Sequence, residues 1–249
     1  MVASAILNKT TLAFILLIIC SSCSQSDGRK YFDAGTKKSA SGDYAGAIAD
    51  LDKAIEINPN YAKAYNNRGI AKDALNDETG AIDDYSKAIE LNPNYQFAFY
   101  NRGNSEQKLN NYLNAVKDYD NAIALDPRDA AVYLNRGNTR YLQNEYEAAI
   151  ADYAKAIELK PQYDKAYGSR GAAKNHLEDF AGAIVDCSKA IEINPQYSEA
   201  YNNRGTSKRG LKDYDGAIAD YSKAIELNPQ YAKAYTNRAA VEALKAGMK

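Results

Sequence analysis

The six prolines of this chain recur at one constant interval. A fixed period of roughly 20–50 residues is the signature of a repeat architecture, in which similar units stack and bury a shared core. The prolines are Pro59, Pro93, Pro127, Pro161, Pro195 and Pro229, and the chain of 249 residues has no others. Aligned on proline, the units span 28–61, 62–95, 96–129, 130–163, 164–197 and 198–231, and a half unit spans 232–249.

Each unit is predicted to form two helices. In residues 62–95, apolar side chains recur at helical spacing on both sides of a polar break at Asn76. Pro93 ends the second helix because proline lacks an N–H and disfavours helix in the residue before it. Glycine recurs in the first helix of all six units, at the position of Gly69, although it costs a helix about 1 kcal/mol relative to alanine. We therefore expect the second helix to cross closely there.

This pattern resembles the tetratricopeptide repeat family over residues 28–249. The shared residues are an aromatic residue, Gly four residues on, Ala twelve further on, and then a second aromatic residue, Ala and Pro at fixed offsets. The fourth position holds Tyr or Phe99 where the family has Trp, the seventh holds Arg or Ala, and the eleventh is charged. The resemblance implies an all-α fold, a right-handed α-solenoid of six helix-turn-helix units. A capping helix over 232–249 completes it, and the first helices line a concave groove.

Tyrosine is abundant because it belongs to the repeat. Of 21 tyrosines, 19 fall on the four unit positions occupied by Tyr65, Tyr85, Tyr95 and Tyr112, which we interpret as core or inter-repeat positions. Cys187 replaces tyrosine at the position of Tyr85, so we expect a locally thinner core around it.

Aspartate recurs at one position of the six full units, and arginine recurs at another position from the second unit through the half unit. If each recurring Asp of a second helix pairs with the Arg of the following unit, every one of these Asp and Arg residues has a partner. The alternative is that both side chains are solvated, in which case a pair contributes only about 0–1 kcal/mol. The aspartates are Asp50, Asp84, Asp118, Asp152, Asp186 and Asp220, and the arginines are Arg68, Arg102, Arg136, Arg170, Arg204 and Arg238.

An asparagine ladder is the candidate binding surface. The family resemblance places the sixth residue of the first helix in the groove, where an amide offers both donors and an acceptor to the backbone of an extended peptide. The ladder resembles that of the repeat domain of eukaryotic protein O-GlcNAc transferases. The alternative is that these amides only satisfy neighbouring groups of the chain itself. The ladder residues are Asn67, Asn101, Asn135, Asn203 and Asn237, with Asp33 and Ser169 as exceptions.

Other groove positions add a predicted apolar patch. Tyr100, Leu134 and Tyr141 fall in the middle units, and exposed apolar clusters often mark partner contacts. Lys233 and other groove lysines would favour acidic ligands, but Glu199 interrupts them.

The composition argues against several functions. With 31 basic and 32 acidic residues, the chain lacks the excess positive charge typical of nucleic-acid binding. A zinc site needs about four ligands, and the chain has one histidine and three cysteines. His176 has no other ligand at suitable spacing, and we interpret it as a polar surface residue. We therefore expect no cofactor, no metal, no nucleic-acid partner and no enzymatic activity.

The N-terminus resembles a bacterial lipoprotein export signal. Leu12–Cys20 is an apolar run of nine residues, too short for a membrane span of about 20. We interpret 1–22 as the signal peptide, Cys23 as the acylated residue and 23–27 as a tether. The alternatives are an ordinary signal cut near Ser24 or an uncleaved anchor.

Together these features predict a non-enzymatic interaction scaffold. We expect it to bind an extended peptide or partner protein in the groove. We also expect it to be exported to the cell envelope as an outer-membrane lipoprotein facing the periplasm. The alternative is an accessory subunit that binds a glycan or small polar ligand for a partner enzyme.

Overall fold

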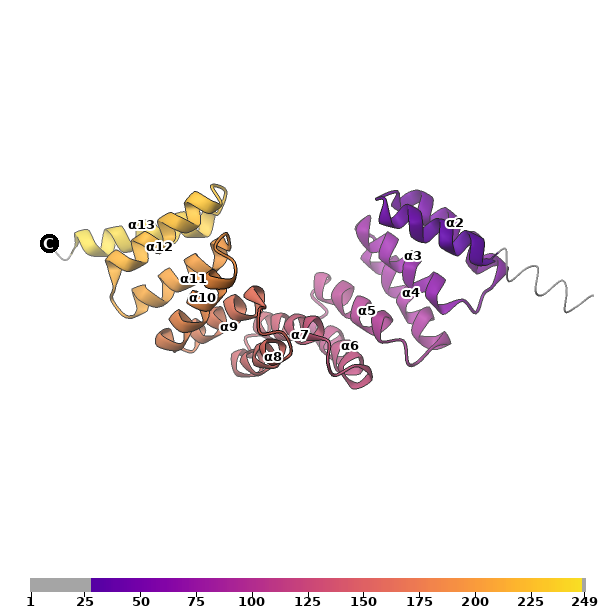
Figure 1. The fold of residues 1–249 in the computed structure, drawn as a ribbon, viewed down its shortest axis with the longest axis horizontal. Coiled ribbons are helices and arrows are strands. Elements are labelled where there is room, and N and C mark those ends of the chain that lie inside the picture. The colour runs from indigo at the N-terminus through magenta and orange to yellow at the C-terminus, as the bar shows by residue number, and fades with distance from the viewer. Residues whose placement is uncertain (1–27, 248–249) are drawn as a thin grey trace, which may run out of the picture. The chain divides into compact units, whose positions relative to one another are not determined.

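The computed structural model describes residues 28–247, and over that range it holds helices and turns but no strand. The all-α fold class, built from repeated helix-turn-helix hairpins, is confirmed (Figure 1). The helices run over residues 28–40 and then α2 Tyr44–Ile57, α3 Ala62–Ala74, α4 Glu78–Leu91, α5 Gln96–Lys108, α6 Tyr112–Leu125, α7 Ala130–Leu142, α8 Tyr146–Leu159, α9 Asp164–His176, α10 Phe180–Ile193, α11 Ser198–Gly210, α12 Tyr214–Leu227 and α13 Ala232–Ala246. Residues 28–40 and the odd-numbered helices are first helices, and the even-numbered ones are second helices.

The chain divides into two compact units, the first ending at Asn111 and the second beginning at Tyr112. Within each unit, every helix packs on the next one along the chain. First helices also contact one another: α3 contacts α5 in the first unit, and α7, α9, α11 and α13 form a continuous series in the second. One face of each unit is therefore lined by first helices.

The turns follow from the residues that occupy them. The first helix of each full repeat is followed by a residue with left-handed backbone, and four of these six residues are glycine or asparagine, which adopt it at little cost. Each second helix ends where an extended residue, such as Asn92, precedes proline. The left-handed residues are Gly42, Asn76, Asn110, Asn144, Glu178 and Lys212.

The repeated glycine marks the closest approach of the two helices in a repeat, as the sequence predicts. A Cβ atom on Gly69 would lie 2.6 Å from Cε1 of Tyr85, and one on Gly137 would lie 2.7 Å from Cε1 of Tyr153. Real Cβ atoms do not approach other atoms this closely. Ala239 holds the same position in the half unit.

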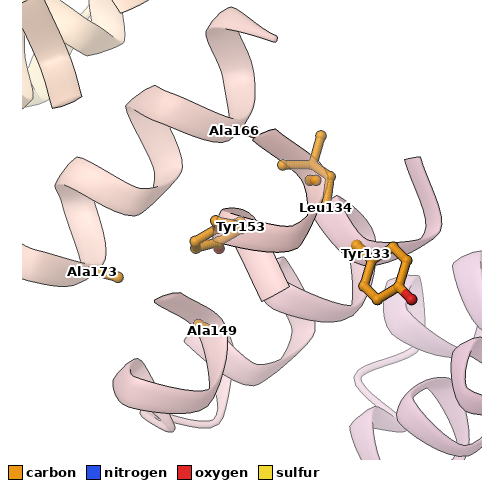
Figure 2. Close-up of a cluster of buried hydrophobic side chains, with 7 residues drawn as sticks. Tyr133, Leu134, Ala149, Tyr153, Ala166 and Ala173 are labelled. Atoms are coloured by element: carbon orange, nitrogen blue, oxygen red, sulfur yellow. The ribbon is translucent and has the colours of Figure 1, made fainter. Parts of the chain in front are cut away.

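The tyrosines of the second helices form the core. Tyr85, Tyr119, Tyr153 and Tyr221 are at most 1% exposed. In the second unit, Tyr153 lies in one buried cluster with Tyr133, Leu134 and several alanines (Figure 2). Cys187 is also fully buried, and a Cβ atom on Gly171 would lie 2.5 Å from its Sγ, so the smaller side chain leaves no gap beside the glycine. The thinner core expected around it stays a prediction.

Candidate functional site

The buried aspartate of a second helix is bound by cations from the first helix of its own repeat. Nε of Arg68 donates to Oδ2 of Asp84 at 2.9 Å, Nη2 donates to Oδ1 at 2.5 Å, and Nζ of Lys72 lies 2.8 Å from Oδ2. The prediction that each Asp meets the Arg of the following repeat is therefore wrong. The same arrangement within one repeat joins Arg136 to Asp152, Arg170 to Asp186 and Arg204 to Asp220.

The pairing with the following repeat was favoured because Asp50 and Arg238 would otherwise lack a partner. The structure gives both residues other partners. Asp50 has its own cation, since Nζ of Lys38 lies 2.7 Å from its carboxylate. Arg238 donates to Oγ of Ser222 at 3.2 Å and lies 3.6 Å from the carboxylate of Glu242. Neither end residue lacks a partner, so the end residues could not discriminate between the two pairings.

The arginine does reach the preceding repeat, but at a different residue. Nη1 of Arg68 contacts Oδ1 of Asp52 at 2.6 Å, and Arg204 contacts Ser188 at the equivalent place. Each such guanidinium therefore joins the second helices of two consecutive repeats. Hydrogen bonding to Asp84, which is 3% exposed, raises the pKa of Arg68, so the solvated interpretation is also wrong for this pair.

The asparagine ladder links consecutive first helices. Nδ2 of Asn101 donates to Oδ1 of Asn66 at 3.1 Å, and Nδ2 of Asn237 donates to Oδ1 of Asn202 at 2.9 Å. The corresponding bonds from Asn67 to Thr36 and from Asn203 to the carbonyl of Gly168 measure 3.0 and 3.4 Å.

The bonds of Asn101, Asn203 and Asn237 to the preceding repeat leave part of each of these amides for a ligand. An asparagine side chain has two N–H donors and an oxygen with two lone pairs, and a bond to the preceding repeat uses one donor. The ladder side chains are half-buried on the face lined by first helices. The structural and ligand-binding interpretations of the ladder are therefore compatible.

The predicted apolar patch is only partly an exposed surface. Leu134, on α7, is 5% exposed and packs in the buried cluster that α7 forms with α8 and α9, so the expectation that it is exposed is wrong (Figure 2). Tyr141 is half-buried, and its hydroxyl lies 2.8 Å from Nε2 of His176. Tyr100, in the first unit, is half-buried on α5.

A pocket of about 330 Å³ opens on the first-helix face of the second unit. It brings together two residues named from the sequence as candidate ligand contacts, Tyr141 and Asn203. Sequence reasoning did not identify Asn138, Ala172 or Tyr231 as part of a site. The lining residues are Asn138, Tyr141 and Leu142 of α7, Tyr153 of α8, Ser169 and Ala172 of α9, Glu199 and Asn203 of α11, and Tyr231 and Lys233 at the start of α13.

The pocket coincides with small side chains in the repeat 164–197. Ser169 stands where five other repeats have the ladder asparagine, and Ala172 stands where the other full repeats have Thr36, Ile70, Asn104, Asn138 and Thr206. These departures from the repeat are the sequence signal that could have located the pocket.

Charges and aromatic rings surround the pocket. Glu199 and Lys233 are exposed and opposite in sign. Burial, assisted by the Glu199 carboxylate, raises the pKa of Tyr231 to about 12, so its phenol stays protonated at neutral pH. Burial and the neighbouring Lys233 lower the pKa of His176, whose ring stacks on Tyr146 at 4.4 Å between centroids.

The first unit has a hollow of about 350 Å³ beside Asn67. Thr36, Ser39 and Ala40 line one side, and Ile70 and Ala74 of α3 line another. Ladder residues therefore border a hollow in each unit.

Two other expectations concern metals and the membrane. Within residues 28–247, no three His, Cys, Asp or Glu side chains gather as metal ligands would. No helix in that same part of the chain has both the length and the apolar character needed to cross a bilayer. The signal peptide, Cys23 and the tether lie outside the described residues.

Stacked helical hairpins with a ligand-sized hollow on the first-helix face define a helical-repeat protein. The chain belongs to the tetratricopeptide repeat family, whose sequence profiles match residues 39–72, 62–95, 100–164 and 198–231. Members of this family typically mediate protein–protein interaction and peptide binding.

Solved structures share this fold. The structure of MamA is 27% identical, with 66% of this chain and 96% of that chain covered and a TM-score of 0.61. Pseudomonas aeruginosa PilF is 17% identical, with 87% and 99% covered and a TM-score of 0.75. YrrB, described as a TPR protein with an unusual peptide-binding site, is 22% identical, with 75% and 96% covered and a TM-score of 0.63. No curated protein sequence matches the chain.

Proposed function

We propose that this protein is a non-enzymatic scaffold that binds an extended polypeptide along the faces lined by its first helices. The observation that carries the proposal is the asparagine ladder, whose amides keep donors and acceptors for a ligand backbone after bonding to the preceding repeat. An extended chain presents alternating N–H and C=O groups, which such amides can bind without reading side chains. The contacts proposed are Asn67, Asn101, Asn135, Asn203 and Asn237, with Tyr100 and Tyr141 beside them and Leu134 supporting α7 from the core.

The family role and the shared fold support this proposal. Peptide binding is typical of tetratricopeptide repeats, and YrrB, which shares the fold, is described by its peptide-binding site. The polar first-helix face with a hollow in each unit suits a ligand that lies across several helices.

A matched pair of variants separates ligand binding from structural support. Asn237→Ala removes an amide from the face, whereas Asn202→Ala removes only the fully buried partner of its structural hydrogen bond. We expect Asn237→Ala to weaken capture of a peptide partner and Asn202→Ala to leave it intact. Equal losses in both variants would show that the ladder acts only through stability.

Site-specific photocrosslinking tests the location of the partner directly. A photoreactive residue at Asn203, on the first-helix face, should crosslink the partner in the native cell. The same group at Glu226, on the exposed side of α12, should not. A partner crosslinked only from Glu226 would exclude the proposed face.

The second candidate is an accessory subunit that binds a glycan or small polar ligand. It is favoured by the combination of tyrosine rings and amide side chains in the pocket, since sugars stack on rings and hydrogen-bond to amides. Titration with a panel of mono- and disaccharides, followed by NMR, tests it: shifts confined to Ser169 and Asn203 would support it.

The export and lipid anchor stay proposals from the sequence of residues 1–27. We propose an outer-membrane lipoprotein facing the periplasm, attached through Cys23, because several acyl chains on one cysteine anchor a protein durably. Labelled palmitate should be incorporated into the wild-type chain and lost in Cys23→Ser. Labelling that persists in Cys23→Ser would rule out this attachment.

A further inference from the structure

The pocket of the second unit is lined by side chains from four first helices, α7, α9, α11 and α13, and from the second helix α8. Its volume of about 330 Å³ lies at the low end of the roughly 300–1,000 Å³ usual for ligand pockets, so it suits one ring system. Ser169 and Ala172 leave space for the pocket, because their side chains are smaller than those at the same positions of most other repeats.

The walls of the pocket are aromatic and aliphatic. Tyr141 and Leu142 come from α7, and Tyr231 precedes α13, so the rings lie on different helices. Aromatic pairs in offset or edge-to-face contact contribute about 0.5–1.5 kcal/mol beyond the area that they bury. A planar side chain is therefore the group that this space would hold best.

Polar atoms line one side of the same pocket. Oδ1 of Asn138 accepts from the hydroxyl of Tyr153 at 3.0 Å, which leaves the two N–H donors of that amide. Ser169 places a hydroxyl in the lining of the same pocket. A ligand ring with a hydroxyl at its edge would find donors and acceptors there.

The charges at the pocket argue against a charged ligand group. Glu199 and Lys233 are both exposed, so water screens them and neither adds much to the binding of a charged group in the pocket. A charged group moved from water into a partly buried site without a dedicated partner is destabilised.

We propose that this pocket holds one tyrosine side chain of the bound polypeptide, and so selects partners that the asparagine ladder would bind without discrimination. The inference rests on the proposed function, since the ladder would hold the backbone while the pocket reads one side chain. Asn203 belongs to both the ladder and the pocket lining, which places the anchor beside the ligand backbone.

The chain itself supplies the variant that tests the pocket. Ser169→Asn with Ala172→Ile installs residues that the repeat 62–95 carries at the same positions, Asn67 and Ile70, so the replacements suit the fold. Both side chains are larger and should fill the hollow. Circular dichroism and the urea midpoint of this variant confirm that it is folded.

The probe is a phage-displayed library of random linear peptides selected on the wild-type chain. Selected peptides should share one tyrosine, and replacing it with alanine should weaken binding at least about tenfold, as expected for burying an aromatic ring. Replacing it with phenylalanine should cost a few-fold through the lost hydrogen bond. The filled variant should bind the tyrosine and alanine peptides equally.

The outcomes separate the two proposals. Peptides that bind through the ladder without any tyrosine preference would overturn the pocket inference and leave the scaffold standing. A filled variant that keeps the full tyrosine preference would also overturn it. Failure to select any peptide would overturn both, and saccharide binding in the pocket would replace the anchor with a sugar ring.

Discussion

The buried aspartates of the second helices α4, α8, α10 and α12 are each held by two cations in this chain. Asp220 is 4% exposed and contacts Nε of Arg204 at 2.9 Å, Nη2 at 2.7 Å and Nζ of Lys208 at 2.8 Å. The cations are about one-fifth exposed, at 20% and 23%, so they keep access to water. Removing a cation leaves the buried carboxylate undercompensated, whereas removing the carboxylate leaves cations that water can still solvate.

Arg204→Ala should therefore lower the free energy of unfolding by about 3 kcal/mol, near the low end for a broken buried ion pair because Lys208 stays. Combined with Asp220→Ala, it should show a coupling energy above about 1 kcal/mol, because residues in one network do not act additively. Urea denaturation of the two single variants and the double variant measures the coupling.

The control cycle joins Arg204→Ala to Asp186→Ala, the equivalent aspartate of the preceding repeat. Asp186 has its own cations, Arg170 and Lys174, so the two effects should nearly add. A larger coupling at Asp186 than at Asp220 would contradict the pairing within one repeat.

The pairing could not be predicted from spacing. A first helix inside the array lies between the second helix of its own repeat and that of the preceding repeat. Arg204 is therefore within reach of carboxylates on both of these second helices. Which carboxylate it binds depends on helix rotation, and this is a property of packing and not of the residue types.

The second helices begin with a coupled pair of residues. Asp77 accepts a hydrogen bond from the backbone N–H of Gly80 at 3.0 Å, which satisfies one donor at the helix start. A Cβ atom on Gly80 would overlap that carboxylate. Where α8 begins, Glu145 makes no such bond and Ala148 replaces the glycine. The same Asp–Gly pair begins α2, α10 and α12.

The effect of Gly80→Ala on the free energy of unfolding should consequently change sign between the wild-type and the Asp77→Ala background. In the wild-type chain it should destabilise, because the methyl group displaces the Asp77 cap, which is itself worth about 1 kcal/mol. In an Asp77→Ala background it should stabilise by about 0.5–1 kcal/mol, since alanine favours helix. Thermal unfolding of the four chains measures both effects.

Ala148→Gly in α8 is the matched control. It should cost about 0.5–1 kcal/mol, because glycine disfavours helix relative to alanine. No carboxylate caps the start of α8, so removing the methyl group gives no capping bond in return. If Gly80→Ala stabilised both backgrounds equally, the clash with Asp77 would be absent.

The helices themselves were predictable, and the pocket was not. The proline period and the repeated glycine indicate two helices per repeat with a close crossing, and the contact of Gly69 with Tyr85 confirms it. The pocket depends on the small size of Ser169 and Ala172 together with Tyr231 from a different helix. Only the packing of several first helices brings those residues together.

Across the molecule, burial of phenol groups links stability to alkaline pH in both units. Burial is the largest cause that raises the pKa of Tyr85 in the first unit and of Tyr153 and Tyr197 in the second. It also raises the pKa of Tyr231 and of the Cys187 thiol to about 12. In the unfolded chain, tyrosine ionises near pH 10.

The free energy of unfolding should therefore be insensitive to tyrosine ionisation below about pH 10 and fall between about pH 10 and 12. In that window the unfolded chain has lost phenol protons that the folded chain retains, so each rise in pH favours unfolding, by up to about 1.4 kcal/mol per pH unit for each such group. Urea midpoints measured from pH 8 to 12 give the slope. Tyr85→Phe and Tyr153→Phe keep the ring and remove one ionisable group from each unit, so the double variant should show a shallower fall. A slope that the double variant leaves unchanged would mean that these phenols ionise in the folded chain as readily as in water, which their burial does not allow.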